Sequence, residues 1–267
     1  MIFVTGDTHS DFHRFSTECF QEQKEMTKDD YVVICGDFGG IWYTEDSKYK
    51  KQEDYWLDWL NDKPFTTLFV DGNHENYDRL DAFPVEEWNG GLIHRIRPNV
   101  IHLMRGCVFN LQGKTFFTFG GASSHDISDG IIPYSENWKE VAKQMEKMRK
   151  YMYRVDHVSW WERELPSKEE MERGIKSLKS VDWKVDYVLT HSPAASVVAL
   201  LGQGLYEQDR LTYYLEDIRC RLDYQKWFAG HFHINKNMNL QDILIYEQIL
   251  YIPTEKDLQK ENEDKER

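Results

Sequence analysis

The sequence contains little that would mark a secreted or membrane protein. Its four cysteines (Cys19, Cys35, Cys107 and Cys220) are scattered and form no CxxC pair, which argues against a disulfide framework or a zinc ribbon. No apolar run approaches the roughly 18 residues of a membrane span. Met1 leads straight into a short apolar run without a basic leader. We therefore expect no secretory signal and a reducing, cytoplasmic setting.

Basic residues are also fewer than acidic ones. The chain has 33 Lys and Arg against 46 Asp and Glu, a formal net charge of −13. Such an acidic chain binds nucleic acid or an anionic membrane poorly unless the contact is specific. A phosphorylated substrate stays compatible with this charge, because bound cations reverse the local field. We expect no membrane partner and no non-specific binding of nucleic acid.

The composition excludes a disordered chain. Of 267 residues, 40% are hydrophobic and 14% aromatic, enough for one large domain or two small ones. We expect one domain over residues 1–253 and a solvated, charged tail over 254–267. The stretch 124–181 is charged, contains tryptophan and has a mostly helical pattern. We interpret it as a helical cap or elaboration, with one helix starting at Ser167 as N-cap.

Short apolar runs bounded by turn residues predict buried strands at residues 2–4, 31–35, 67–70, 187–190 and 226–229. Apolar side chains near a 3.6-residue period predict helices around Phe12–Phe20 and Tyr55–Leu60. Residues 107–111 and 115–119 flank a short turn containing Gly113, which predicts a hairpin. The alternation of strands and helices is typical of a layered α/β fold.

Five polar motifs follow the predicted strands. They are Gly6-Asp7-Thr8-His9, Gly36-Asp37, Gly72-Asn73-His74-Glu75, Thr190-His191-Ser192 and Gly230-His231-Phe232-His233. Ligand sites of open α/β sheets lie at the carboxyl ends of the strands, so these motifs should converge. Carboxylate, imidazole and amide groups together suit Mn, Fe, Zn or a similar ion. Asp37, between two groups of ligands, could bridge two cations.

In this order the five motifs resemble the calcineurin-like metallophosphoesterase superfamily, whose pattern is D-x-H, G-D, G-N-H-[ED], H and G-H-x-H. The resemblance spans Asp7 to His233. It implies a four-layer α/β/β/α sandwich of two mixed sheets with flanking helices. It also implies a metal-dependent phosphoric ester hydrolase, either a phosphatase or a phosphodiesterase, that acts through a hydroxide bridging two metal ions.

The resemblance also assigns residues by position. One metal site would use Asp7, His9, Asp37 and His233, and the other Asp37, Asn73, His191 and His231. Manganese is the expected metal, with Fe, Zn, Ni or Co as alternatives. Asp37, Asn73 and His74 would be the catalytic residues, with His74 beyond the metals and acting on phosphate as an acid or a charge-stabilising ligand.

The second motif departs from the family of protein phosphatases. Gly36-Asp37-Phe38-Gly39-Gly40 lacks the Arg that grips phosphate in their G-D-x-V-D-R-G pattern. This weakens a Ser/Thr phosphatase. The G-H-x-H ending resembles the diesterase and small-molecule branches of the superfamily, which implies a phosphorylated small molecule or nucleotide as substrate. The alternatives are a nuclease, which needs a basic track, and a catalytically silent scaffold that binds a protein. The motifs favour neither a phosphomonoester nor a phosphodiester as the substrate.

The other polar side chains are expected to be structural. These are the histidines outside the motifs (His13, His94, His102, His125 and His157). Glu75 is expected at a helix N-terminus rather than on a metal. Arg154 is more often solvated or structural than a phosphate ligand, although the cap could bring it to the substrate.

Overall fold

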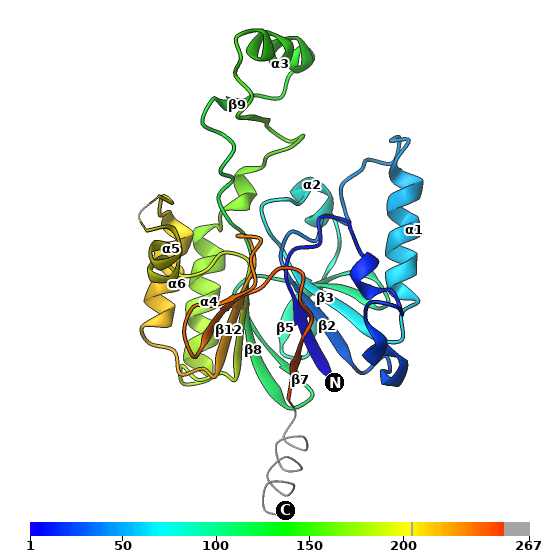
Figure 1. The fold of residues 1–267 in the computed structure, drawn as a ribbon, viewed down its shortest axis with the longest axis vertical. Coiled ribbons are helices and arrows are strands. Elements are labelled where there is room, and N and C mark those ends of the chain that lie inside the picture. The colour runs from blue at the N-terminus through cyan, green and yellow to red at the C-terminus, as the bar shows by residue number, and fades with distance from the viewer. Residues whose placement is uncertain (204, 254–267) are drawn as a thin grey trace, which may run out of the picture.

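The computed structural model describes residues 1–203 and 205–253, and the predicted charged tail 254–267 lies outside them. Two mixed sheets face each other, and helices cover both outer faces (Figure 1). This is the predicted four-layer sandwich. Among the described residues, no helix is long and apolar enough to span a membrane.

The seven-stranded sheet has the order β15-β1-β2-β3-β6-β5-β4. Strands β1, β2, β3 and β6 are parallel, whereas β15, β5 and β4 each pair antiparallel with a neighbour. Their bounds are β1 Ile2–Thr5, β2 Tyr31–Cys35, β3 Thr66–Val70, β4 Val85–Trp88, β5 Gly91–Arg97, β6 Val100–Leu103 and β15 Leu250–Ile252.

The six-stranded sheet has the order β13-β14-β12-β11-β8-β7. Its inner strands are parallel and its two edges antiparallel, and the predicted hairpin forms β7 and β8. The bounds are β7 Cys107–Leu111, β8 Lys114–Phe119, β11 Tyr187–Thr190, β12 Lys226–Ala229, β13 Lys236–Asn237 and β14 Asp242–Leu244. All five motif strands therefore form where the sequence predicts them.

Alternate residues of the central strands enter different cores. In β2, Val33 and Cys35 face the core between the two sheets, whereas Val32 and Ile34 face the core under the outer helices. Side chains of a strand alternate between its faces, so a strand covered on both sides must be apolar throughout. This double burial explains the continuous apolar runs that mark the motif strands.

The helices are distributed between the outer layers and the loops. Helix α1 covers the seven-stranded sheet, and helices α4, α5 and α6 cover the six-stranded one (Figure 1). The bounds are α1 Lys50–Asn61, α2 Tyr77–Leu80, α3 Trp138–Lys147, α4 Lys168–Ser180, α5 Ala195–Gly202 and α6 Arg210–Arg219, with short 3₁₀ turns at His13–Phe15, Gln21–Glu25 and Glu162–Glu164.

The helix predicted around Phe12–Phe20 is wrong. Phe12, Phe15 and Phe20 are buried as a helix face would be, but only short 3₁₀ turns form there. Polar side chains form hydrogen bonds with backbone groups that would pair with one another in a helix. The Gln23 amide donates to the carbonyls of Phe15 and Phe20, and the Ser16 hydroxyl accepts from the amide of Cys19.

The segment 124–181 has two different parts. Helix α4 begins at the predicted N-cap Ser167, which forms a capping box with Glu170, and α4 packs on the six-stranded sheet. Residues 125–160, which we call the insert, carry α3 and the small sheet of β9 (Gly130–Ile132) and β10 (Tyr153–Val155). The insert stands away from the two sheets (Figure 1).

Candidate metal centre

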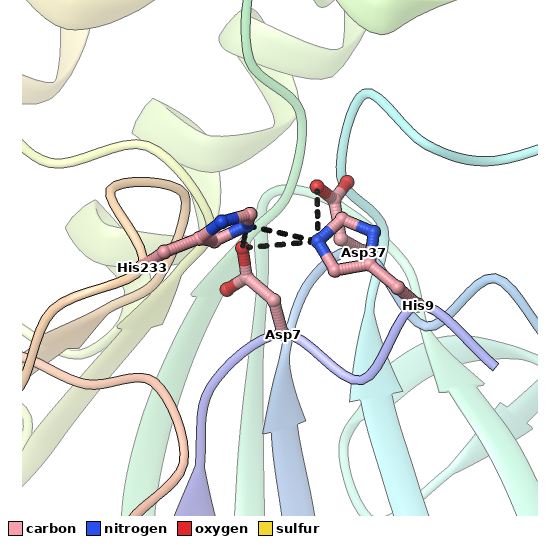
Figure 2. Close-up of side chains that lie close together, drawn as sticks. All are labelled: Asp7, His9, Asp37 and His233. Carbon is pink, nitrogen blue, oxygen red and sulfur yellow. Dashed lines mark hydrogen bonds and ion pairs between the residues drawn. The ribbon is translucent and has the colours of Figure 1, made fainter. Parts of the chain in front are cut away.

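The motif side chains meet at one edge of the sandwich. Strands β1, β2 and β3 of one sheet and β11 and β12 of the other all carry their motifs at their carboxyl ends. Four side chains gather there, with their ligand atoms all within 4.8 Å of one another: Asp7, His9, Asp37 and His233 (Figure 2). These are the residues that the sequence assigned to the first metal site, and we call them the ligand cluster.

Within the ligand cluster the carboxylates lie deep and the imidazoles lie at the rim. His9 Nε2 is 2.9 Å from His233 Nε2 and 3.7 Å from Asp37 Oδ2, and His233 Nε2 is 3.1 Å from Asp7 Oδ2. Asp7 is fully buried, whereas the His233 side chain is 47% exposed. A cation held between them would be reachable from solvent on the imidazole side.

The second predicted group shares Asp37 with the first. The Nε2 atom of His191 lies 3.3 Å from Asp37 Oδ1 and 3.3 Å from the side-chain oxygen of Asn73. Its other ring nitrogen, Nδ1, lies 2.9 Å from the Cys35 carbonyl, which fixes the ring with Nε2 toward Asp37. The two carboxylate oxygens of Asp37 thus face different histidines, as a shared ligand requires.

His231 lies beside this second group, and its ring has an unexpected neighbour. The ring centroids of His231 and His191 are 5.0 Å apart, and the His231 amide donates to Asp7 Oδ1 at 3.0 Å. His231 Nε2 lies 2.8 Å from Nε2 of His125, at the start of the insert. The sequence treated His125 as structural, because its distance along the chain from the motif gives no signal of this contact.

His74 is fixed next to the ligand cluster. Its backbone amide donates to Asp37 Oδ1 at 2.7 Å, and its ring centroid lies 5.0 Å from that of His9. Burial lowers the pKa of His74, the Asp37 carboxylate opposes this, and the Arg154 guanidinium adds to it. Arg154 itself forms an ion pair with Asp126 at 2.7 Å.

The backbone at the site is strained. His9, Asp37, His231 and His233 all have positive φ angles, between 45° and 70°. Residues with a Cβ atom rarely adopt this region, and each instance costs on the order of 1–3 kcal/mol. Four of the predicted ligands therefore hold conformations that the rest of the fold has to impose, which is typical of a functional site.

The glycines of the motifs make room for ligands of other motifs. A Cβ atom on Gly72 would lie 2.0 Å from Asp37 Oδ1, and one on Gly230 would lie 2.2 Å from Asp7 Oδ1. No side chain fits at either distance. The glycine that precedes each ligand in the sequence thus allows the close approach of strand ends that brings the carboxylates together.

Electrostatics at the centre favour bound positive charge. Burial alone would lower the pKa of His191, but the carboxylates of Asp37 and Asp7 and its hydrogen bonds raise it to about 10. Burial would raise the pKa of Asp37, but the surrounding histidines, His191 first, hold it well below its ordinary value. A divalent ion bound there would take the place of the proton on His191.

Buried polar groups other than the predicted ligands support the loops of the site. The Glu75 carboxylate accepts the backbone amides of Phe38 at 2.7 Å and Gly39 at 3.3 Å. Glu75 directly precedes Asn76, the N-cap of α2, so it lies at a helix N-terminus as expected, but its carboxylate holds the turn after Asp37. Burial, with the nearby Asp37 charge, raises its pKa well above the ordinary range.

A second support lies under the Asn73–His74 loop. The Asp71 carboxylate accepts Arg105 Nε at 2.7 Å and the Tyr77 hydroxyl at 2.8 Å, and it lies 3.1 Å from His102 Nε2. Asp71 and Arg105 are almost completely buried. An Arg–carboxylate pair at this depth fixes the end of β3 and, with it, the loop that carries Asn73.

The donor set fits divalent transition metals. Carboxylate oxygens and imidazole nitrogens are the groups that bind Mn, Fe, Co and Zn in proteins. The ligand cluster offers two of each within 4.8 Å, and Asp37, Asn73 and His191 offer a second set next to it. The arrangement is consistent with metal binding at this edge.

Comparison with known proteins agrees with this chemistry. A family model described as calcineurin-like phosphoesterase matches residues 1–235. Among curated proteins, the lariat debranching enzyme of Danio rerio is 20% identical over 256 residues, which cover 87% of this chain and 40% of the relative. The lariat debranching enzyme of Schizosaccharomyces pombe is 25% identical over 226 residues, which cover 78% of this chain and 44% of the relative.

A third relative matches a shorter stretch. Lariat debranching enzyme A of Xenopus laevis is 28% identical over 150 residues, which cover 51% of this chain and 27% of the relative. The chain spans less than half the length of these relatives. The family model, by contrast, covers most of the chain and all five motifs through His233. With its two mixed sheets and its ligand cluster at the strand ends, the chain belongs to the calcineurin-like phosphoesterase family.

Proposed function

We propose that this protein hydrolyses a phosphodiester bond in a nucleic acid or oligonucleotide, with two divalent metal ions, manganese first among them, held at the strand ends. The observation that carries the proposal is the convergence of Asp7, His9, Asp37 and His233 from three distant motifs to within 4.8 Å. One ion would be held by this cluster and the other by Asp37, Asn73, His191 and His231.

Each residue has a distinct task in this proposal. When bound, the two ions would polarise the phosphate and lower the pKa of a water molecule to near neutrality. Asp37 orients both ligand groups, because its two oxygens face His9 and His191. The His74 ring stands beside His9 and would donate a hydrogen bond or a proton to the phosphate or to the leaving oxygen.

Two observations support a nucleic-acid substrate rather than a small molecule. The relatives are named as lariat debranching enzymes. Within the insert, residues 138–154 form a local basic stretch in an otherwise acidic chain, with six basic and two acidic residues. Lysine and arginine next to exposed aromatic rings, such as Tyr151 at 67% exposure, suit a phosphate backbone with bases. We propose that the insert caps the metal centre on the substrate side.

The test is hydrolysis of a defined substrate set. Protein loaded with Mn²⁺ is incubated with short RNA linked 3′–5′, the same RNA with one 2′–5′ linkage, and a matched 5′-phosphomonoester. We expect diester cleavage that EDTA abolishes and that Asp37→Asn lacks. Cleavage of the monoester alone would contradict the proposal, and activity on none of them with metals bound would favour the scaffold alternative.

A further inference from the structure

Aromatic rings border the ligand cluster on the side of the seven-stranded sheet. A cavity of about 250 Å³ lies there, lined by His9, Ser10, Gly39, Trp42, Tyr43 and His74. Trp42 and Tyr43 belong to the loop between β2 and α1. Their backbone amides both donate to the Glu53 carboxylate of α1, at 2.5 and 2.8 Å. The Trp42 ring packs edge-on against Trp161 at 5.6 Å between centroids. The walls of this cavity are therefore fixed by buried contacts.

A second set of rings borders the centre on the side of the six-stranded sheet. Tyr206, from the loop between α5 and α6, lies 5.0 Å from Phe232, centroid to centroid. Phe232 stands between the predicted ligands His231 and His233. His125 lies 6.0 Å from Tyr206 and 6.3 Å from Phe232. These three side chains form a surface that we call the aromatic ledge. Tyr206 is 41% exposed, so part of its ring is available to a ligand.

The aromatic ledge is positioned by its own loop. A Cβ atom on Gly202 would lie 2.2 Å from the Tyr206 ring, which means that the ring rests directly on the end of α5. The ledge and the cavity come from loops of opposite sheets, and the ligand cluster lies at the edge where those sheets meet. A phosphate on the metals would therefore have an aromatic surface on each side.

We infer that these two surfaces bind the bases of the two nucleosides that the scissile phosphate joins. The cavity takes the base of the leaving nucleoside, because His74 is one of its walls, and the aromatic ledge takes the other base. This inference rests on the proposed function and makes the substrate a diester with a base on both sides. Stacking on tyrosine, tryptophan or phenylalanine suits any base, so the site would recognise bases without a strict sequence.

The experiment uses one dinucleotide and two analogues in which a stable abasic sugar replaces one base or the other. KM is measured with metal-loaded wild type, Tyr43→Ala and Tyr206→Ala. Tyr43→Phe and Tyr206→Phe keep the ring, and Tyr213→Ala removes an exposed ring elsewhere, on α6. We expect each alanine variant to raise KM for the dinucleotide about five- to fiftyfold. The phenylalanine variants should raise KM less than the alanine variants because they keep the ring, and Tyr213→Ala should match wild type.

The pattern across analogues decides the outcome. The Tyr43→Ala defect should vanish when the leaving nucleoside is abasic, and the Tyr206→Ala defect should vanish with the other analogue. Two results would overturn the inference while leaving the proposed function intact. One is an equal KM for all three substrates in wild type, and the other is a KM increase in each alanine variant that is the same with and without the corresponding base. Failure of wild type to cleave any diester would instead contradict the proposed function.

A binding measurement gives a second readout. Quenching of tryptophan fluorescence is followed as a non-cleavable methylenephosphonate dinucleotide is added to metal-loaded protein. The inference expects weaker binding in Tyr43→Ala and in Tyr206→Ala and unchanged binding in Tyr213→Ala. Unchanged affinity in both alanine variants would overturn it, whatever the activity.

Discussion

The edge of the sandwich that carries the predicted ligands and the insert differ in how their side chains are held in place. At the edge, buried contacts across the sandwich fix the ligands: His231 binds Asp7 through its amide, and His191 is held by the Cys35 carbonyl. The insert has a small core of its own, made of Ile132, Ala142 and Val155 with a few neighbours. Its rings at Tyr134 and Tyr151 are more than 60% exposed. The predicted ligands are held by contacts within the sandwich, whereas the region proposed to meet the substrate packs around a small core of its own.

One buried group ties the edge of the sandwich to the chain that returns from the insert. Arg105 pairs with Asp71 below the Asn73–His74 loop, and its Nη2 also donates to the carbonyl of Arg163, just beyond the insert, at 2.8 Å. The returning chain is thus tied to the strand end that carries His74. The predictions below separate changes at the edge from changes in the insert, and they run from the largest expected effect to the smallest.

Among variants that keep both metal ions, removal of His74 should give the largest loss of activity. We expect His74→Ala to keep its metals and to lose about 10²–10⁴-fold in kcat on an RNA diester, since general acid help matters most for an alkoxide leaving group. The defect should shrink on a nitrophenyl diester. The control is His13→Ala, which removes an exposed histidine outside the ligand cluster. Full turnover of His74→Ala on both substrates would remove His74 from the mechanism.

Loss of Arg105 should destabilise the fold. Arg105→Ala leaves the buried Asp71 carboxylate without its cation, which typically costs about 3–5 kcal/mol. Urea unfolding followed by circular dichroism measures the change. Lys143→Ala, on an exposed position of α3, should stay within about 0.5 kcal/mol of wild type. Similar midpoints for both variants would show that the Arg105–Asp71 pair does not stabilise the site.

Glu164 should make stability fall as pH rises. Burial raises the pKa of this carboxyl to about 8, although hydrogen bonds from Ser124 oppose the shift. Between its ordinary pKa and about 8 the folded state binds more protons than the unfolded state, so stability present at low pH is lost across that window. In Glu164→Gln the loss from pH 5 to pH 9 should be smaller by at least about 1 kcal/mol. Parallel pH curves for the two proteins would contradict this.

Charge reversal in the insert should give the smallest effect. Lys143→Glu with Lys147→Glu should weaken binding of a short RNA severalfold and flatten its salt dependence, because fewer phosphate contacts release fewer counterions. Melting temperature and dinucleotide hydrolysis should not change. The matched control is Lys176→Glu with Lys179→Glu on α4, outside the insert. Equal effects of the two double variants would show that the insert has no special role.

The sequence predicted the fold and the location of the site because both follow from local patterns. Doubly buried strands need continuous apolar runs, and each such run ended in a motif, as at Val70 and Ala229. The helix at Phe12–Phe20 was wrong because burial spacing alone does not reveal the side-chain bonds of Gln23. Assignment of individual ligands to particular ions stays a prediction.

Long-range features of the site had no sequence signal. The positive φ angles at His9 and Asp37 are imposed by surrounding packing. Arg105 meets Asp71 across 34 residues, and His125 meets His231 across 106. A charged residue far along the chain looks the same in sequence whether it ends on the surface or under an active site.

The most direct test of the central claim is the number of ions that Asp37 holds. Purified protein is loaded with Mn²⁺, desalted and analysed for bound metal, alongside Asp37→Asn and His191→Ala, with circular dichroism to verify folding. If Asp37 is shared by two sites, wild type should hold two ions per chain, His191→Ala one, and Asp37→Asn fewer than one. Equal metal content in wild type and folded Asp37→Asn would contradict the account.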